Sequence, residues 1–130
     1  MNPSQVVSLL IVISLIIGMA LHKKRALHKW WMIATVLTDI ALVAYLTFAR
    51  NAVIKAMDST MGNKEFSAIL VIHISFAVMS IVCYVIGIML GFKISAGQVR
   101  LLSAHRINAR VMLLFRCLTF ITAFFIPISN

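Results

Sequence analysis

The sequence predicts an all-α integral membrane protein, an up-down bundle of four transmembrane helices with both termini on the non-cytoplasmic side. Hydrophobic residues make up 62% of the 130-residue chain and charged residues only 12%, whereas about 25% of the residues of a soluble domain are charged. The apolar residues form four long runs that short connections separate. No soluble domain fits between these runs, so residues 1–130 are predicted to form a single membrane domain.

The four predicted spans cover residues 6–21, 30–49, 68–92 and 111–126, and each approaches the roughly 20 apolar residues that cross a bilayer. Basic residues follow the first run rather than precede it, unlike a cleaved secretion signal, so we expect this run to remain as a span. We expect the last helix to begin near Gly97, to project beyond the membrane and to end at Pro127. The connection around residues 57–63 is predicted to contain a turn.

The charge of the chain predicts its orientation. A net charge of +9 would suggest a nucleic-acid partner in a soluble protein, but here the basic residues lie between the spans, so we expect none. The first and third connections contain Lys23, Lys24, Arg25 and Lys29, and Lys93, Arg100, Arg106 and Arg110, whereas the second contains Arg50, Lys55 and Lys64. Lys and Arg are enriched in cytoplasmic loops. The first and third connections are therefore predicted to face the cytoplasm, and membrane lipid is predicted to surround the helices.

Each predicted helix carries one stripe of residues, reached from its histidine by steps of four and three, which we call its seam. Such steps follow one face of a helix. The seams are Ser8, Ile11, Leu15, Gly18 and His22; His28, Met32, Thr35, Asp39, Leu42 and Leu46; His73, Ala77, Ser80, Tyr84, Gly87 and Gly91; and His105, Ala109, Met112, Arg116, Thr119 and Ala123. Small and polar residues gather at helix interfaces in membranes. The seams therefore predict the inner faces of the bundle.

Two charged residues, Asp39 and Arg116, lie on seams inside predicted spans. Asp39 is about 13 Å along its helix from Trp30 and Arg116 about 9 Å beyond Arg110, at 1.5 Å per residue. An unpaired charge at such depth costs at least about 2.5–3.5 kcal/mol, so we predict that the two residues pair across the second and fourth helices. The pair could only fix the register of these helices. Alternatively, Arg116 neutralises a haem propionate or a quinone, or Asp39 relays protons.

The histidines are the candidate metal ligands. His28 and His105 begin their seams at comparable depth and could hold one haem b between the second and fourth helices. His73 lies near the other end of its span and could serve a second centre, or could bind copper together with Met57 and Met61. Alternatively, His28 and His105 are polar residues at the membrane interface without a ligand. We interpret His22 in this second way. The two cysteines, Cys83 and Cys117, lie inside apolar runs and are expected to be unpaired and buried.

Three short motifs carry a resemblance to a known family. They are residues 28–35, which open one span with His28-Lys29-Trp30-Trp31; residues 71–74, which centre on His73; and residues 105–110, which open the last span with His105-Arg106. Over about residues 27–125 the chain resembles the small bacterial membrane family called domain of unknown function 420, linked to the maturation of haem–copper oxidases. The resemblance implies a four-helix membrane protein in a respiratory setting, with histidines at the positions of His28, His73 and His105.

Asp39 and Arg116 depart from the family. From the resemblance we would expect apolar or small residues at both positions. Each charged residue follows its motif histidine by eleven positions, so the two departures are equivalent in helical position. Such a paired departure fits an ion pair. It also favours a dedicated subunit of a particular complex over a general assembly factor.

Three hypotheses for the function follow. The first is a redox-associated protein that binds haem b through His28, His73 or His105, with Arg116 as a further cofactor contact. It would carry electrons, to or from a quinone, or serve oxidase maturation within a respiratory complex. The second is a non-catalytic accessory subunit of a membrane complex, and the third is a copper-handling protein. The sequence contains no nucleophile–base pair, phosphate loop or HExxH motif, so we expect a subunit rather than a stand-alone enzyme.

Overall fold

The computed structural model describes residues 3–45, 48 and 64–125, and this part of the chain is helical, without strands. The four long helices are α1 (Pro3–Ala20), α2 (Arg25–Ala44), α4 (Lys64–Ser95) and α5 (Leu102–Ala123). Two short 3₁₀ turns, η1 (Leu21–Lys23) and η3 (Val99–Leu101), precede α2 and α5. The predicted turn at residues 57–63 and the predicted helix end at Pro127 lie outside the described residues.

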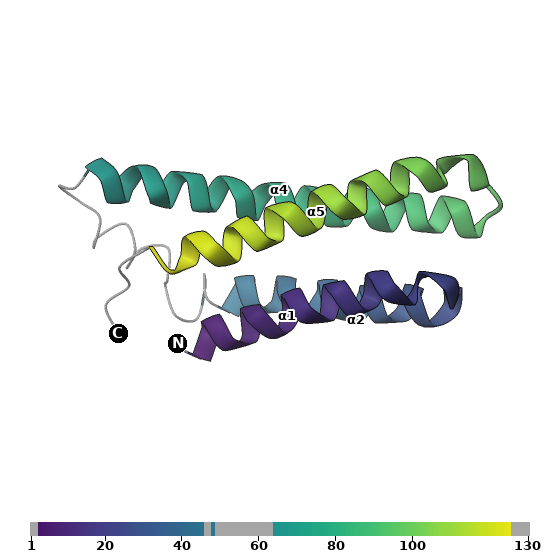
Figure 1. Ribbon diagram of the computed structural model, residues 1–130, viewed down its shortest axis with the longest axis horizontal. Helices are drawn as coiled ribbons and strands as arrows, with labels where there is room; N and C mark the ends of the chain where they lie inside the picture. Colours follow the sequence, from purple (N-terminus) through teal and green to yellow (C-terminus); the bar gives the residue numbers. More distant parts are fainter. Residues whose placement is uncertain (1–2, 46–47, 49–63, 126–130) are drawn as a thin grey trace.

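Successive helices run in opposite directions along one long axis (Figure 1). The helix α1 packs against α2 and α5, and α4 packs along α5, whereas α2 and α4 touch at fewer points. The η1 and η3 turns lie at the same end of the molecule, and the start of α1 lies at the other end (Figure 1). Polar groups carried by α2 and α5 can therefore meet only in the interior of the bundle, between the other two helices.

The turn from α4 into α5 depends on Gly97. Its φ is +105°, a value that L residues with a side chain rarely adopt. The N–H of Gly97 donates to the carbonyl of Ile94 at 3.0 Å, and the N–H of Gln98 donates to the carbonyl of Lys93 at 3.1 Å. This pair of bonds is a Schellman motif, which satisfies the last carbonyls of a helix. The turn therefore lies at Gly97, close to where the sequence predicts the last helix to begin, and α5 itself starts at Leu102.

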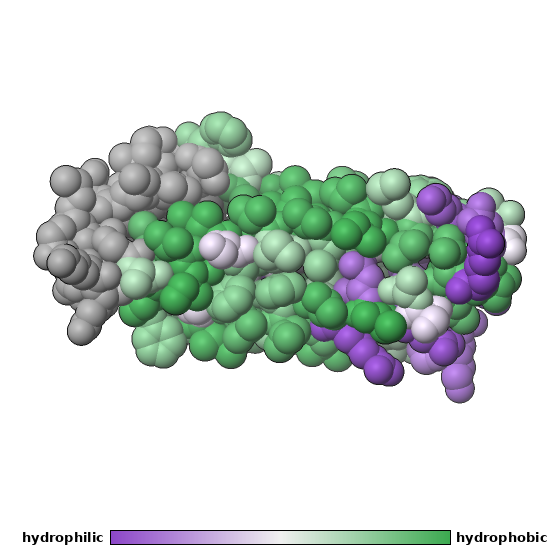
Figure 2. Space-filling view, turned by 90° about the horizontal axis from the view of Figure 1, so that it is seen from above, coloured by the Kyte–Doolittle hydropathy of each residue, from purple (hydrophilic) through white to green (hydrophobic). Residues whose placement is uncertain are grey.

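Three of the helical segments are long and apolar enough to cross a membrane: Pro3–Lys23, Arg25–Ala44 and Ala68–Ser95. The helix α5, which contains residues 111–123 of the fourth predicted span, is not among them within the described residues. Its 22 residues include Arg106, Arg110 and Arg116, which lower its hydropathy. Figure 2 shows a broad hydrophobic surface with hydrophilic residues gathered at the end of the η1 and η3 turns. This distribution fits helices whose apolar faces contact lipid.

The interior of the bundle follows the seams. The buried apolar cluster consists of Ile11, Leu15, Val36, Cys83, Tyr84 and Met112, and the buried polar residues are Thr35, Asp39, Ser80, Arg116 and Thr119. Except for Val36 and Cys83, each of these lies on a predicted seam. Leu15 of α1 has no exposed surface at all. The periodicity of the sequence therefore identified the inward faces of all four long helices.

Candidate functional site

His28 and His105 face each other inside one end of the bundle. Each is the fourth residue of its helix, counted from Arg25 in α2 and from Leu102 in α5. Their ring centroids are 6.4 Å apart and their planes meet at 86°. Gly91 of α4 lies beside them, because a Cβ added there would be 3.7 Å from Cε1 of His105. The predicted meeting of these two histidines is therefore present in the structure.

The hydrogen bonds of the two rings determine which nitrogens could bind a metal. Nδ1 of His28 lies 2.6 Å from the carbonyl oxygen of Gly18, and because a carbonyl only accepts, this nitrogen carries the proton. Nε2 of His28 is therefore the nitrogen that remains to bind a metal. Nδ1 of His105 is buried without a hydrogen-bond partner among the described residues. Metal-binding histidines commonly donate their second nitrogen to a backbone carbonyl, as His28 does here.

Burial keeps His105 uncharged. Loss of hydration lowers the pKa of His105 below its ordinary value, and the neighbouring His28 lowers that pKa further, against a smaller opposing effect of the Gly87 backbone. A neutral imidazole is the form that binds metals. The environment of His105 therefore favours a ligand over a proton-carrying cation at neutral pH.

The separation of the two rings fits one metal ion between them. Nitrogen ligands bind first-row metals at about 2.0–2.1 Å. Two imidazoles on opposite sides of one ion therefore have ring centres about 6 Å apart, since each centre lies about 1 Å behind its nitrogen. The observed centroid distance of 6.4 Å agrees with this value. The unpartnered Nδ1 of His105 and the lack of a side chain at Gly91 also fit a group held at this place.

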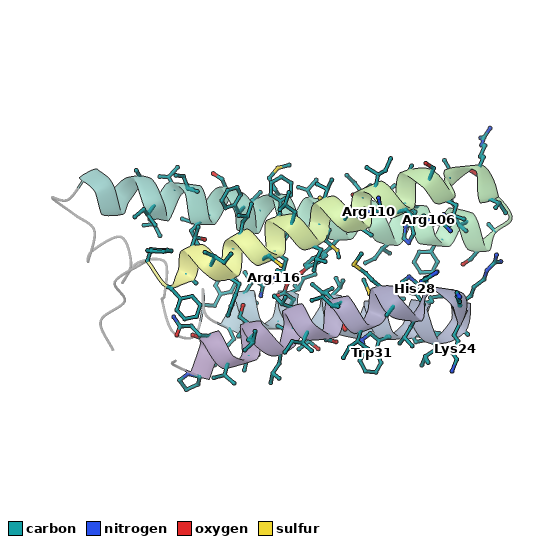
Figure 3. The ribbon with its side chains drawn as sticks, in the orientation of Figure 1. Lys24, His28, Trp31, Arg106, Arg110 and Arg116 are labelled. Carbon is teal, nitrogen blue, oxygen red and sulfur yellow. The ribbon has the colours of Figure 1, made fainter. Side chains whose placement is uncertain are left out.

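Basic side chains surround the same end of the bundle. Lys24, Arg106 and Arg110 lie near His28 in the view of Figure 3. The ammonium of Lys29 lies 5.8 Å from the ring centroid of Trp30 and 4.9 Å from that of Phe92. Cations at a membrane boundary attract the acidic groups of lipids and cofactors.

Asp39 and Arg116 form the second polar feature, an ion pair in the middle of the bundle. Nε of Arg116 lies 2.8 Å from Oδ2 of Asp39, and Nη2 lies 2.9 Å from Oδ1. Tyr84 also donates its hydroxyl to Oδ2, and Nη2 of Arg116 donates to Oγ of Ser8 at 2.9 Å. The side chains of Arg116 and Asp39 are 6% and 4% exposed. The pairing that the sequence predicts is thus present, and four helices contribute to it.

Tyr84 and Ser8 are members of this cluster that sequence reasoning did not name as partners. Both lie on the seams of their helices, which was the available signal. A seam indicates the inward face of a helix but not the neighbour that each side chain reaches. The assignment of Arg116 as a contact for a cofactor is not favoured by this geometry, because two of its nitrogens already bind protein oxygens.

His73 lies far from the other two candidate histidines. Its Nδ1 is 2.8 Å from Oγ1 of Thr122, and Thr122 in turn donates to the carbonyls of Leu118 and Thr119. Along α4, His73 is 18 residues from Gly91, or about 27 Å at helical rise. His73 and the pair of His28 and His105 therefore belong to different ends of the bundle. Met57 and Met61, its predicted copper partners, lie outside the described residues.

The remaining candidates have simple surroundings. His22 is exposed, and its Nδ1 lies 3.1 Å from the carbonyl of Met19. Cys83 is buried and Cys117 half-buried, and both are free thiols. Within the described ranges, no group of three or more His, Cys, Asp or Glu side chains could hold a metal. The pair of His28 and His105 is therefore the strongest candidate site, and it supplies two ligands.

No family model, curated protein or solved structure matches this chain.

Proposed function

We propose that this chain is a small polytopic membrane protein of a respiratory or redox system, and that it binds haem b through His28 and His105. The observation that supports this is the separation of the two rings, 6.4 Å between centroids, at which one iron can accept a nitrogen from each. The resemblance to the family linked to oxidase maturation points to the same setting. Electron transfer within a larger complex, or a role in oxidase maturation, is the proposed activity.

The residues of the chain have distinct tasks in this proposal. His28 and His105 would hold the haem, and the carbonyl of Gly18 orients the ring of His28. Lys24, Arg106 and Arg110, which lie toward the hydrophilic end (Figure 3), would bind the propionates. Haem b, when bound, supplies one-electron redox chemistry. The helices exclude water from the ligands, because Nδ1 of His105 is buried.

The proposed membrane topology is an up-down bundle of four transmembrane helices with both termini outside the cytoplasm of a bacterial inner membrane. The basic end, with the η1 and η3 turns, would face the cytoplasm. The helix α5 would cross as the fourth span because Asp39 neutralises Arg116, while Arg106 and Arg110 remain at the basic end (Figure 3). A buried charge becomes tolerable in a membrane when it is paired.

A reduced-minus-oxidised spectrum of the purified protein tests the haem proposal. Haem would be supplied during expression, and the protein kept in mild detergent. We expect b-type bands in the parent protein and in His73→Ala, and their loss in His28→Ala and His105→Ala. His22→Ala is the matched control, because His22 is exposed. A folded, haem-supplied protein without b-type bands would refute the proposal.

An accessory subunit without a cofactor is the second candidate, and one observation favours it. The side chains of Asp39, Arg116, Tyr84 and Ser8 bond to one another and join four helices, so the bundle has internal support of its own. This candidate predicts that the His28→Ala variant stays associated with its membrane complex after mild solubilisation. If His28→Ala loses both the complex and the haem bands, His28 is needed for haem binding and also for assembly of the complex.

A further inference from the structure

A small cavity, partly open to the surface and lined largely by apolar groups, lies next to the ion pair, between α2, α4 and α5. Its volume is about 20 Å³, and a cavity needs roughly 10–15 Å³ of such space to hold one water molecule. Its polar lining consists of Asp39, Ser80, Tyr84, Arg116 and Thr119. The ring of a quinone is far larger than one water, so the cavity as it stands fits only the smaller guest.

The hydrogen bonds of the lining residues determine whether a molecule in the cavity must donate or accept hydrogen bonds. Ser80 donates its hydroxyl proton to the carbonyl of Phe76 at 2.9 Å, and Thr119 donates to the carbonyl of Phe115 at 2.8 Å. Tyr84 donates its proton to Asp39. Each hydroxyl has one proton, so all three can only accept a hydrogen bond from a guest.

Of the two remaining polar members of the lining, Asp39 accepts and Arg116 can only donate. Arg116 has five N–H groups and no acceptor, and its Nε and Nη2 bind Asp39 and Ser8. A guest that serves both kinds of partner must donate to hydroxyl oxygens and accept from a guanidinium. Water does both and has the required size, whereas a quinone carbonyl accepts only.

We propose that this cavity is the binding site of one water molecule, which donates to the hydroxyl oxygens of Ser80 or Thr119 and bonds to the Asp39–Arg116–Tyr84 cluster. Thr119 also connects the cavity to the other end of the bundle. Its carbonyl accepts from Thr122 at 3.1 Å, and Thr122 is bonded to His73. A hydrogen-bonded path therefore runs from His73 through Thr122 to the backbone of Thr119, whose side chain lines the cavity.

The substitution Thr119→Val tests the site, because valine keeps the shape of threonine and removes the acceptor oxygen. Thr38→Val is the matched control. Thr38 makes the same bond to the carbonyl four residues earlier, at 2.8 Å, but is exposed. We expect Thr119→Val to lower the melting temperature of the protein in detergent by about 4 °C more than Thr38→Val does, the shift typical of one lost hydrogen bond. An equal effect, or a gain in stability, would mean that the cavity is dry.

Hydrogen exchange at Tyr84 provides a second readout that is independent of stability. The chain has 2 tyrosines, so Tyr45→Phe leaves Tyr84 as the single phenol for infrared spectroscopy in D₂O. With water in the cavity, we expect the Tyr84 hydroxyl to exchange about tenfold more slowly in Thr119→Val than in Thr38→Val. Equal exchange rates in the two variants would overturn the proposal.

Discussion

Asp39 of α2 and Arg116 of α5 form a two-point ion pair, and Tyr84 of α4 and Ser8 of α1 complete it with one hydrogen bond each. One buried cluster thus contacts all four long helices. Such an arrangement fixes the register of each helix relative to the others, because a shift of one residue would move a charge away from its partner. Several predictions about stability depend on this cluster and on the histidines at the basic end.

Removing one charge of the ion pair is expected to be worse than removing both. Asp39→Asn leaves the guanidinium of Arg116 buried without a counter-charge, which costs about 3–5 kcal/mol in comparable cases. The double variant Asp39→Leu with Arg116→Leu leaves no buried charge, and we expect it to retain more stability. Thermal unfolding in detergent measures both. A single variant as stable as the parent protein would show that the pair does not support the fold.

The hydroxyl of Tyr84 is expected to stabilise the carboxylate of Asp39. Tyr84→Phe removes a hydrogen bond to a charged group, which is worth about 1.5–3 kcal/mol. Tyr45→Phe is the matched control because Tyr45 is 53% exposed, and we expect it to change the melting temperature little. If the two variants unfold at the same temperature, the bond to Asp39 contributes nothing to stability.

The protein is expected to lose stability in mild acid because of His105. Burial lowers its pKa in the folded protein below the ordinary value of 6.5, so the unfolded chain takes up a proton at a higher pH than the folded one. Stability should therefore be constant well above pH 6.5 and should decrease as the pH falls below it. We expect His105→Gln to show a smaller loss between pH 7.5 and pH 5.5 than the parent protein. An identical pH dependence in both would assign the acid sensitivity to other groups.

Gly18 is expected to tolerate no side chain. A Cβ there would lie 2.9 Å from Cδ1 of Trp31, and the indole of Trp31 is held by a 2.9 Å bond to the carbonyl of Ser14. Overpacking of this kind costs about 1–3 kcal/mol, so Gly18→Ala should lower the unfolding temperature. Gly91→Ala is the control, because its added Cβ would meet His105 at an ordinary 3.7 Å. Equal stability of the two variants would indicate that Trp31 moves aside freely.

The agreement between sequence and structure is closest where a single helix carries the information. Thr35 and Asp39 of α2, and Met112, Arg116 and Thr119 of α5, are buried as their seams predict. The prediction of a fourth apolar span is less well matched, since α5 is not among the helices that are apolar enough to cross a membrane. Its arginines at positions 106, 110 and 116 are the reason. Only the pairing of Arg116 in three dimensions makes a membrane position for this helix reasonable.

By itself, the sequence determined which face of each helix lies inward and how far along its helix each of Asp39, Arg116 and the histidines lies, because both follow from helical period and rise. The tertiary structure decided the partners. It brought His28 to His105, bonded His73 to Thr122 and added Tyr84 and Ser8 to the ion pair. The physical reason is one of range. Hydrogen bonds and ion pairs form within about 3–4 Å, a distance set by how neighbouring helices pack, which the period of one helix does not contain.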